Sequence, residues 1–287
     1  MDENKLFRIN VREILRSKAP KLYKKIPGFA ITLLSRLICE DQLNACLQAN
    51  EGLTGVPFMQ NMIRDFNIFL QLQGTENLPD FDHKCIFASN HPLGGMDGIC
   101  LSAVLGERYY GQIRYLVNDI LYYIEPLQDI FVPVNKHGAQ AKTAVASLNE
   151  AFASENQIIT FPAGLCSRKT KGVIHDPRWK KMFISKAVEY QRDVVPVYFE
   201  ATNSNFFYTF ANIRTKLGLK FNIEMLLLPG EMLKTQNAVF TIRFGKPVSW
   251  QTFDSSKTPQ QWADEIEKMV YNTRNPQYTL TDGRNNT

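Results

Sequence analysis

The feature that most constrains the fold is an alternation of short β-rich runs with helix-like segments between about residues 84 and 244. Several of the runs are almost entirely apolar, as expected for strands that are covered on both faces. The predicted strands are residues 85–88, 113–117, 130–134, 158–161, 194–199 and 239–244, and the predicted helices between them are 98–105, 140–153 and 179–191. This order predicts an α/β fold, with a mostly parallel central sheet flanked by helices.

Composition sets broad limits on the partners of the chain. With 287 residues, it is long enough for one large α/β domain with an appended helical piece. The net charge of +5 favours an anionic partner, such as phospholipid headgroups or an acidic carrier protein. Five cysteines are scattered without a CxxC pair, which predicts reduced thiols in a cytoplasmic protein. We expect no metal, because no His, Cys and Asp cluster has ligand spacing.

The N-terminal residues form a basic segment with apolar stripes. Residues 5–25 predict one amphipathic helix, which should break at Pro27 and Gly28, and the apolar run 26–38 predicts a second, shorter helix. Such a pair suits shallow insertion into an anionic leaflet, and a hairpin packed on the domain is the alternative. The apolar run is too short to span a bilayer. We therefore predict a helical, membrane-associating segment over residues 1–80 and an α/β domain over residues 81–287.

The loop after the first predicted core strand carries the chemistry. It reads Asn-His-Pro-Leu-Gly-Gly-Met-Asp from position 90 to position 97. Gly94 and Gly95 allow the backbone to turn sharply and approach a ligand, so that Asp97 can reach back to the His91 imidazole. Such a contact would fix the tautomer of the ring and stabilise its protonated form. We predict that His91 is a general base oriented by Asp97; a helix N-cap is the alternative role for the aspartate.

This loop resembles the histidine–aspartate signature of the glycerolipid (lysophosphatidic acid) acyltransferase superfamily. In that family, the histidine deprotonates an acceptor hydroxyl, which attacks an acyl thioester on coenzyme A or acyl carrier protein. Five residues separate His91 from Asp97, where the family usually has four. The variant resembles a branch of bacterial lyso-ornithine and glycine-lipid O-acyltransferases. The resemblance implies that Asn90, Gly94 and Gly95 lie in the substrate site.

Three further blocks resemble the family in the same order. Residues 131–136 are similar to its second block, residues 161–168 to its Phe-Pro-Glu-Gly block, and residues 194–197 to a fourth block that shapes the apolar wall of the site. Ala163 stands where the family has glutamate. The resemblance places the following residues in the acceptor site, with the last two binding an anionic group: Asn135, Lys136, Phe161, Pro162, Gly164, Arg168 and Lys169.

Other polar groups leave alternatives open. Residues 168–181 form a basic stretch, which is either a solvated face or an electrostatic funnel for phosphate, carboxylate or an acidic carrier. Backbone N–H groups of Gly94, Gly95 or Gly164 are candidate donors to an oxyanion. We expect no nucleic-acid partner, because interleaved aromatic residues and a recognised motif are both missing.

The resemblance implies an O-acyltransferase without a cofactor. It would move a fatty acyl group from acyl-carrier protein or acyl-CoA to the hydroxyl of a lyso-lipid, as a peripheral protein at the cytoplasmic face of the inner membrane. The acceptor is either a lyso-aminolipid or 1-acylglycerol 3-phosphate, and Ala163 together with the longer loop favours the lyso-aminolipid. A catalytically inactive membrane-binding homologue and a thioester or lipid hydrolase are the alternatives.

Overall fold

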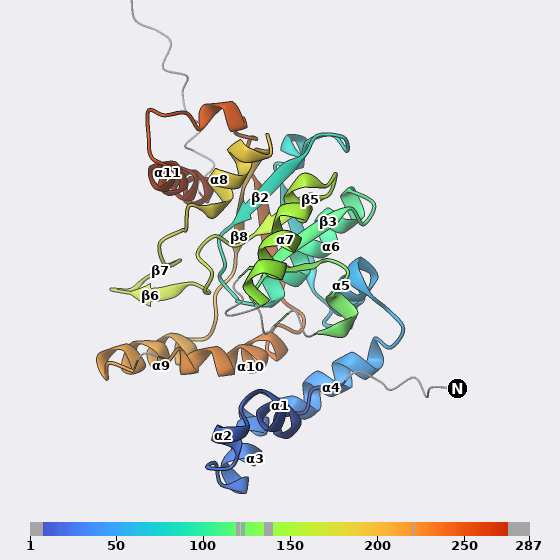
Figure 1. Ribbon diagram of the computed structural model, residues 1–287, viewed down its shortest axis with the longest axis vertical. Coiled ribbons are helices and arrows are strands. Elements are labelled where there is room, and N and C mark those ends of the chain that lie inside the picture. Colours follow the sequence, from blue (N-terminus) through green and yellow to red (C-terminus); the bar gives the residue numbers. More distant parts are fainter. Residues whose placement is uncertain (1–7, 119–120, 122–123, 135–139, 220, 275–287) are drawn as a thin grey trace, which may run out of the picture.

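The computed structural model describes residues 8–118, 121, 124–134, 140–219 and 221–274. Within them, the central element is a seven-stranded sheet with the order β1-β9-β8-β2-β5-β3-β4 (Figure 1). Its strands are β1 (Phe69–Gln73), β2 (Cys85–Ser89), β3 (Ile113–Val117), β4 (Phe131–Pro133), β5 (Gln157–Thr160), β8 (Asp193–Glu200) and β9 (Val239–Phe244). Neighbouring strands are parallel, except that β8 and β9 are antiparallel. The predicted fold class is therefore confirmed.

All six predicted strands are present, and the sheet contains one strand that the sequence did not predict. This strand, β1, lies at the edge of the sheet next to β9, and most of its side chains are exposed. Because it is largely exposed, it lacks the continuous apolar run that marks the buried strands. It also lies inside the range 1–80 that we assigned to the helical segment, so the sheet begins earlier than residue 81. The division into two parts stays a prediction.

Helices cover both faces of the sheet. The helix α5 (Gly55–Asp65) packs with α6 (Met96–Arg108) on one face, and α7 (Gln140–Ala153), α8 (Met182–Glu189) and α11 (Pro259–Asn272) contribute to the core on the other. The predicted helices at 98–105, 140–153 and 179–191 correspond to α6, α7 and α8.

Strand β2 shows why its sequence is apolar throughout. Cys85 and Phe87 point into the core shared with α5 and α6, whereas Ile86 and Ala88 point into the core shared with α7, α8 and α11. All four side chains are fully buried. Because successive residues of a strand face opposite sides, a central strand between two helical layers needs apolar residues at every position.

Before α5, the described N-terminal residues form four short helices: α1 (Val11–Lys18), α2 (Pro20–Tyr23), α3 (Gly28–Leu37) and α4 (Glu40–Ala49). The single helix predicted over 5–25 is therefore wrong; Pro20 cannot donate a backbone hydrogen bond within a continuous helix and begins α2 instead. The predicted break at Pro27 is confirmed, because Pro27 is extended and α3 begins at the next residue, Gly28. The segment lies at the lower end of the molecule, below the sheet (Figure 1).

Between β5 and β9 the chain forms elements that the sequence did not predict. Strands β6 (Arg168–Thr170) and β7 (Val173–His175) pair as an antiparallel hairpin, and α9 (Asn205–Lys216), a 3-10 turn (Ile223–Leu227) and α10 (Leu228–Leu233) follow β8. Among the described residues, no helix is both long and apolar enough to cross a membrane. The five cysteines are free thiols, as predicted.

Candidate active site

His91 and Asp97 meet at the carboxyl edge of the parallel strands. Strand β2 ends at Ser89, and its neighbour β5 ends at Thr160, so the loops that follow both strands leave the sheet side by side. The His91 loop closes onto the start of α6, where Nδ1 of His91 lies 2.9 Å from Oδ2 of Asp97. The Asp97 side chain is fully buried, and that of His91 is 13% exposed. The structure thus brings together the two residues that the sequence singled out.

Asp97 is not the N-cap of α6, so that alternative is wrong. The capping position is Gly95, and Asp97 lies within the first turn. Its carboxylate turns back into the loop and accepts backbone N–H groups from Leu93 at 2.9 Å and from Gly98 at 2.9 Å. These bonds fix the carboxylate in place without help from His91.

Gly94 is required by the tight loop. Its φ of 77° lies in the left-handed region, and a Cβ at this position would come within 2.7 Å of the Leu228 side chain and 3.1 Å of Cys166. A side chain at position 94 would therefore strain the backbone and clash with α10. The glycine keeps the loop against these neighbours and preserves the turn between His91 and Asp97.

The electrostatics of the pair favour a protonated ring beside an ionised carboxylate. Burial lowers the pKa of His91, but the charge and hydrogen bond of Asp97 raise it by more, and the charge of Asp176 adds to this rise. For Asp97, burial raises the pKa, whereas His91 and the loop N–H groups lower it to below its ordinary value. The site can therefore stabilise the imidazolium that forms when His91 takes a proton.

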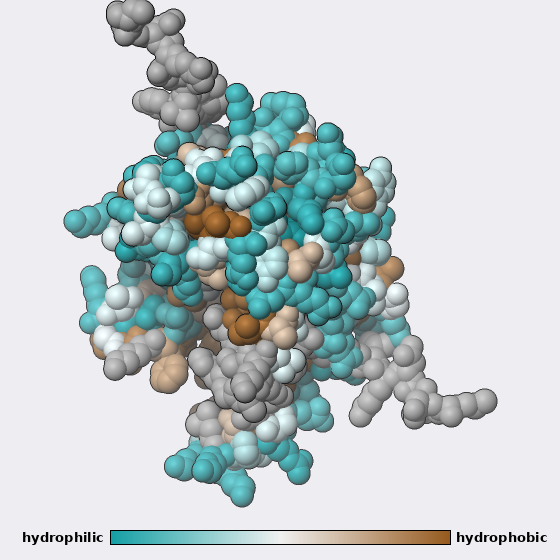
Figure 2. Space-filling model, turned by 45° about the horizontal axis from the view of Figure 1, so that its top comes forward, coloured by the Kyte–Doolittle hydropathy of each residue, from teal (hydrophilic) through white to brown (hydrophobic). Residues whose placement is uncertain are grey.

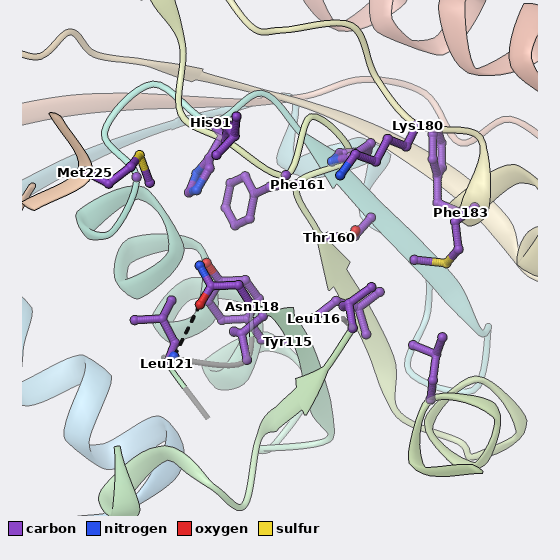
Figure 3. Close-up of a pocket in the computed structure, with 18 residues that line it drawn as sticks. His91, Tyr115, Leu116, Asn118, Leu121, Thr160, Phe161, Lys180, Phe183 and Met225 are labelled. Carbon is purple, nitrogen blue, oxygen red and sulfur yellow. Dashed lines mark hydrogen bonds between the residues drawn. The ribbon is translucent and has the colours of Figure 1, made fainter. Parts of the chain in front are cut away.

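His91 lies at the edge of a cavity of about 280 Å³ (Figure 3). Its ring lies 4.2 Å from that of Phe161, measured between centroids, and Phe161 contacts Tyr115 edge to face. Nδ1 is bound to Asp97, and Nε2 has no hydrogen-bond partner among the described residues. The remaining walls are largely apolar and come from β3, α7, α8 and the residue that follows β4: Leu116, Val117, Val134, Leu148, Met182 and Phe183.

A second carboxylate, which our sequence analysis missed, holds the backbone of the loop. Asp176 is buried and accepts the N–H of His91 at 3.1 Å, the hydroxyl of Ser167 at 2.6 Å and the indole N–H of Trp179 at 3.0 Å. Ser167 in turn donates its backbone N–H to the carbonyl of His91 at 2.8 Å. Burial raises the pKa of Asp176, and these hydrogen bonds only partly offset the rise. The sequence signal was that Asp176 is the single carboxylate within the basic stretch 168–181.

Four of the predicted substrate-binding residues line the cavity: Gly94, Phe161, Pro162 and Gly164. Asn90 does not. It is buried, and its side chain accepts the N–H of Phe199 at 2.6 Å and donates to the carbonyl of Phe199 at 2.9 Å, so it joins the end of β2 to β8. Asn135 and Lys136 lie outside the described residues. The 194–197 block belongs to β8, and none of its residues lines the cavity.

The predicted cations point elsewhere. The Arg168 guanidinium donates to Glu224 at 2.9 Å and to the Cys166 carbonyl at 2.7 Å, and Lys169 donates to Asn205 at 3.0 Å. Neither side chain lines the cavity. Lys180, from the same basic stretch, does line it. The Lys180 ammonium lies 3.0 Å from the point where a Cβ on Gly164 would stand. Figure 3 shows Lys180 on the side of the cavity that faces Phe161.

The predicted oxyanion donors differ in their present partners. The Gly94 N–H donates to Oδ2 of Asp97 at 3.3 Å, and the Gly164 N–H donates to the carbonyl of Phe161 at 2.9 Å. Gly95, at the N-terminal end of α6, has a backbone N–H without an acceptor among the described residues. Within the same residues, no cluster of three or more His, Cys, Asp or Glu side chains is arranged to hold a metal ion.

Comparison with known proteins places the chain in a family. The model of the acyltransferase family matches residues 13–279. A lyso-glycine lipid O-acyltransferase of Phocaeicola vulgatus is 46% identical over 94% of this chain and 97% of its own length, and one of Bacteroides thetaiotaomicron is 47% identical over 94% and 99%. A solved structure, the 1-acyl-sn-glycerophosphate acyltransferase PlsC of Thermotoga maritima, matches with a TM-score of 0.48 and 16% identity, over 85% of this chain and 95% of that one. The chain belongs to the acyltransferase family.

Proposed function

We propose that this acyltransferase moves a fatty acyl group from an acyl thioester to the hydroxyl of lyso-glycine lipid. The observation that carries the proposal is the buried His91–Asp97 pair at the edge of a largely apolar cavity. Two relatives of nearly the same length, 46% and 47% identical, are named for this acceptor. The sequence alone is also compatible with lysophosphatidate as acceptor, and the names of the two relatives favour the aminolipid.

In the proposed reaction, Nε2 of His91 takes the proton of the acceptor hydroxyl while its oxygen attacks the thioester carbonyl carbon. The carbonyl oxygen becomes an oxyanion, for which the Gly95 N–H is the proposed donor, because Gly94 and Gly164 already donate elsewhere. Collapse of the intermediate breaks the carbon–sulfur bond, and the leaving thiolate takes the proton back from Nε2. The products are an ester and a free thiol, and no acyl-enzyme forms.

Asp97 has two roles in this scheme. By accepting a hydrogen bond from Nδ1–H at 2.9 Å, it selects the tautomer whose Nε2 lone pair is free to act as a base. It then stabilises the imidazolium while the proton resides on the ring. General-base catalysis of this kind contributes about 10²–10⁴-fold to the rate.

The cavity suits both ends of the proposed substrates. Leu116, Leu148 and Phe183 form an apolar surface for a fatty acyl chain. Lys180 provides a cation for the carboxylate of the glycine headgroup. Ala163, which replaces the glutamate of the family pattern, is buried in the core with Trp179 and does not line the cavity. Position 163 therefore contributes no side chain to the proposed acceptor site.

We also propose that the protein works as a peripheral protein at the cytoplasmic face of the inner membrane. In support, α1 exposes the cations Arg12 and Arg16, and α3 exposes Phe29 and Leu33, which are 76% and 64% accessible. Basic residues next to exposed apolar side chains suit an anionic leaflet.

A turnover assay tests the proposed function. The purified chain is given lyso-glycine lipid, lyso-ornithine lipid and lysophosphatidate side by side, each with acyl-carrier protein and with acyl-CoA as donor. We expect the O-acylated product to form fastest from lyso-glycine lipid. A preference for lysophosphatidate would contradict the acceptor, release of free fatty acid without an acceptor would indicate a hydrolase, and no turnover with any pair would indicate an inactive homologue.

A further inference from the structure

Helix α9 is apolar on two opposite faces. Its inner face buries Phe207, Tyr208 and Ala211 against the rest of the protein. Its outer face carries a second apolar row, which we call the α9 stripe: Phe206, Phe210, Ile213 and Leu217. These residues follow the i, i+4, i+7, i+11 spacing that places side chains on one side of a helix.

The α9 stripe is open to solvent along most of its length. Phe206, Ile213 and Leu217 are 62%, 50% and 68% exposed, and the Phe206 and Phe210 rings stack with centroids 6.2 Å apart. The chain continues the apolar surface after the helix ends, where Phe221 is 84% exposed. A contiguous apolar row of this kind marks a binding surface rather than ordinary scattered exposure.

The exposed charge around the α9 stripe is positive. Residues 205–223 contain three lysines and arginines, and the adjoining hairpin 168–175 contains three more. The neighbouring carboxylate, Glu224, is fully buried and pairs with Arg168 and Arg214, so the lysines remain to face solvent. The hairpin is joined to α9 by Asn212, whose side chain donates to the carbonyl of Lys169 at 3.1 Å. Lys171, in the turn of the hairpin, and Lys216, at the end of α9, are exposed. The partner of this surface should therefore be apolar and anionic.

The α9 stripe lies at the same end of the molecule as the N-terminal helices. Gly230 of α10 is adjacent to the side chain of Cys39, at the junction of α3 and α4, and Figure 1 shows α9 and α10 just above the N-terminal segment. The opposite end, which carries α11, is mostly hydrophilic with a few separate apolar patches (Figure 2). Two exposed apolar helices, α3 and α9, thus mark one end of the protein, as contact with an extended flat surface requires.

We infer that the α9 stripe and its flanking lysines are a second membrane-contact surface, which binds an anionic phospholipid bilayer alongside the N-terminal helices. The apolar side chains enter the boundary between headgroups and acyl chains, and the cations contact anionic headgroups. Contact at α9 in addition to α3 would hold the α/β core itself against the lipid, whereas the N-terminal segment alone would only tether it. The inference goes beyond the proposed acceptor and does not depend on turnover.

Vesicle binding by the full-length chain tests the inference. Co-sedimentation is measured with phosphatidylcholine vesicles that contain phosphatidylglycerol, in the absence of any acyl donor. We expect Ile213→Glu and Leu217→Glu each to weaken binding about tenfold or more, because burial of each aliphatic side chain is lost. Lys171→Gln and Lys216→Gln should each weaken it about fivefold at low salt. The matched control is Val188→Glu, at a 40% exposed position on α8.

A second measurement avoids the charge of glutamate. The emission of Leu217→Trp, taken as a difference from wild type, should shift to the blue when vesicles are added. The inference would be overturned if both glutamate variants bind vesicles as strongly as wild type does, or if the emission of Leu217→Trp does not shift. Two other outcomes would also overturn it, if Ile213→Glu binds vesicles as strongly as wild type does. In the first, wild type is a dimer that Ile213→Glu dissociates; in the second, Ile213→Glu no longer binds acyl carrier protein. Circular dichroism and thermal unfolding confirm that each variant is folded.

Discussion

The Asp176 carboxylate holds the main chain of His91 from a position 85 residues further along the sequence, accepting its N–H at 3.1 Å and 3.2 Å. The Ser167 backbone N–H donates to the carbonyl of the same residue, so the main-chain N–H and C=O of His91 are held by two buried residues that flank the 168–175 hairpin. The orientation of the proposed base thus depends on the basic stretch as well as on its own loop.

Asp176→Asn should lower kcat about tenfold and change the acceptor KM little, because the base is displaced slightly while the cavity stays intact. Since the charge of Asp176 raises the pKa of His91, the variant should also shift the acid limb of the rate profile to lower pH. Steady-state kinetics across pH measure both effects. Ser167→Ala, which removes a single hydrogen bond to Asp176, should show a weaker form of the kcat effect, and an unchanged kcat in Asp176→Asn would refute the positioning role.

Asp97→Asn tests the orientation of the ring. The catalytic form of His91 is neutral, so the rate rises with pH through the raised pKa of His91. Without the Asp97 charge this pKa falls, so the acid limb should move to lower pH while the maximal rate drops about 10²–10⁴-fold. The pH dependence of kcat/KM measures both. A wild-type rate and profile would reduce Asp97 to a structural residue of the loop.

Lys180→Ala should raise the KM for lyso-glycine lipid about tenfold and leave kcat nearly unchanged, because a charge-assisted hydrogen bond to the headgroup is lost. Lys181→Ala is the matched control, since the neighbouring lysine is also exposed but does not line the cavity. Initial rates at varied acceptor concentration separate the two constants. Equal effects of the two substitutions would indicate only a general contribution of positive charge.

Arg12→Gln and Arg16→Gln should each weaken binding to anionic vesicles about fivefold at low salt, and the difference should disappear as salt is added. Vesicle co-sedimentation over a range of ionic strength measures this. Lys268→Gln, on α11 at the other end of the molecule, provides the control. If vesicle binding does not depend on salt and neither substitution weakens it, the N-terminal cations do not contribute to membrane binding.

Much of the core could be predicted from the sequence, because buried parallel strands have continuous apolar sequences. Residues 113–117 and 140–153 were predicted with the bounds that the structure shows. The edge strand β1 was not predicted, because its residues are nearly all exposed and form no such run. Pro20 was overlooked as a break in the first helix, although its missing N–H predicts one.

At the site, contacts between residues close in the sequence could be predicted, whereas contacts between distant residues could not. The six-residue step from His91 to Asp97 allowed the pair to be predicted. The contact between Asp176 and His91 spans 85 residues, and no local pattern encodes it. Arg168 was expected to bind substrate, but its guanidinium pairs with Glu224, a partner 56 residues away that the sequence could not reveal.

The most direct test of the central claim compares two histidines in one assay. His83 and His91 both lie 2.9 Å from an aspartate, but His83 precedes β2 and pairs with Asp193, whereas His91 follows β2 at the cavity. Formation of O-acylated glycine lipid from acyl thioester and lyso-glycine lipid is measured for His83→Ala, His91→Ala and wild type, with folding checked by circular dichroism. The account predicts near-normal turnover for His83→Ala and loss of turnover for folded His91→Ala. Near-normal turnover by His91→Ala would contradict it.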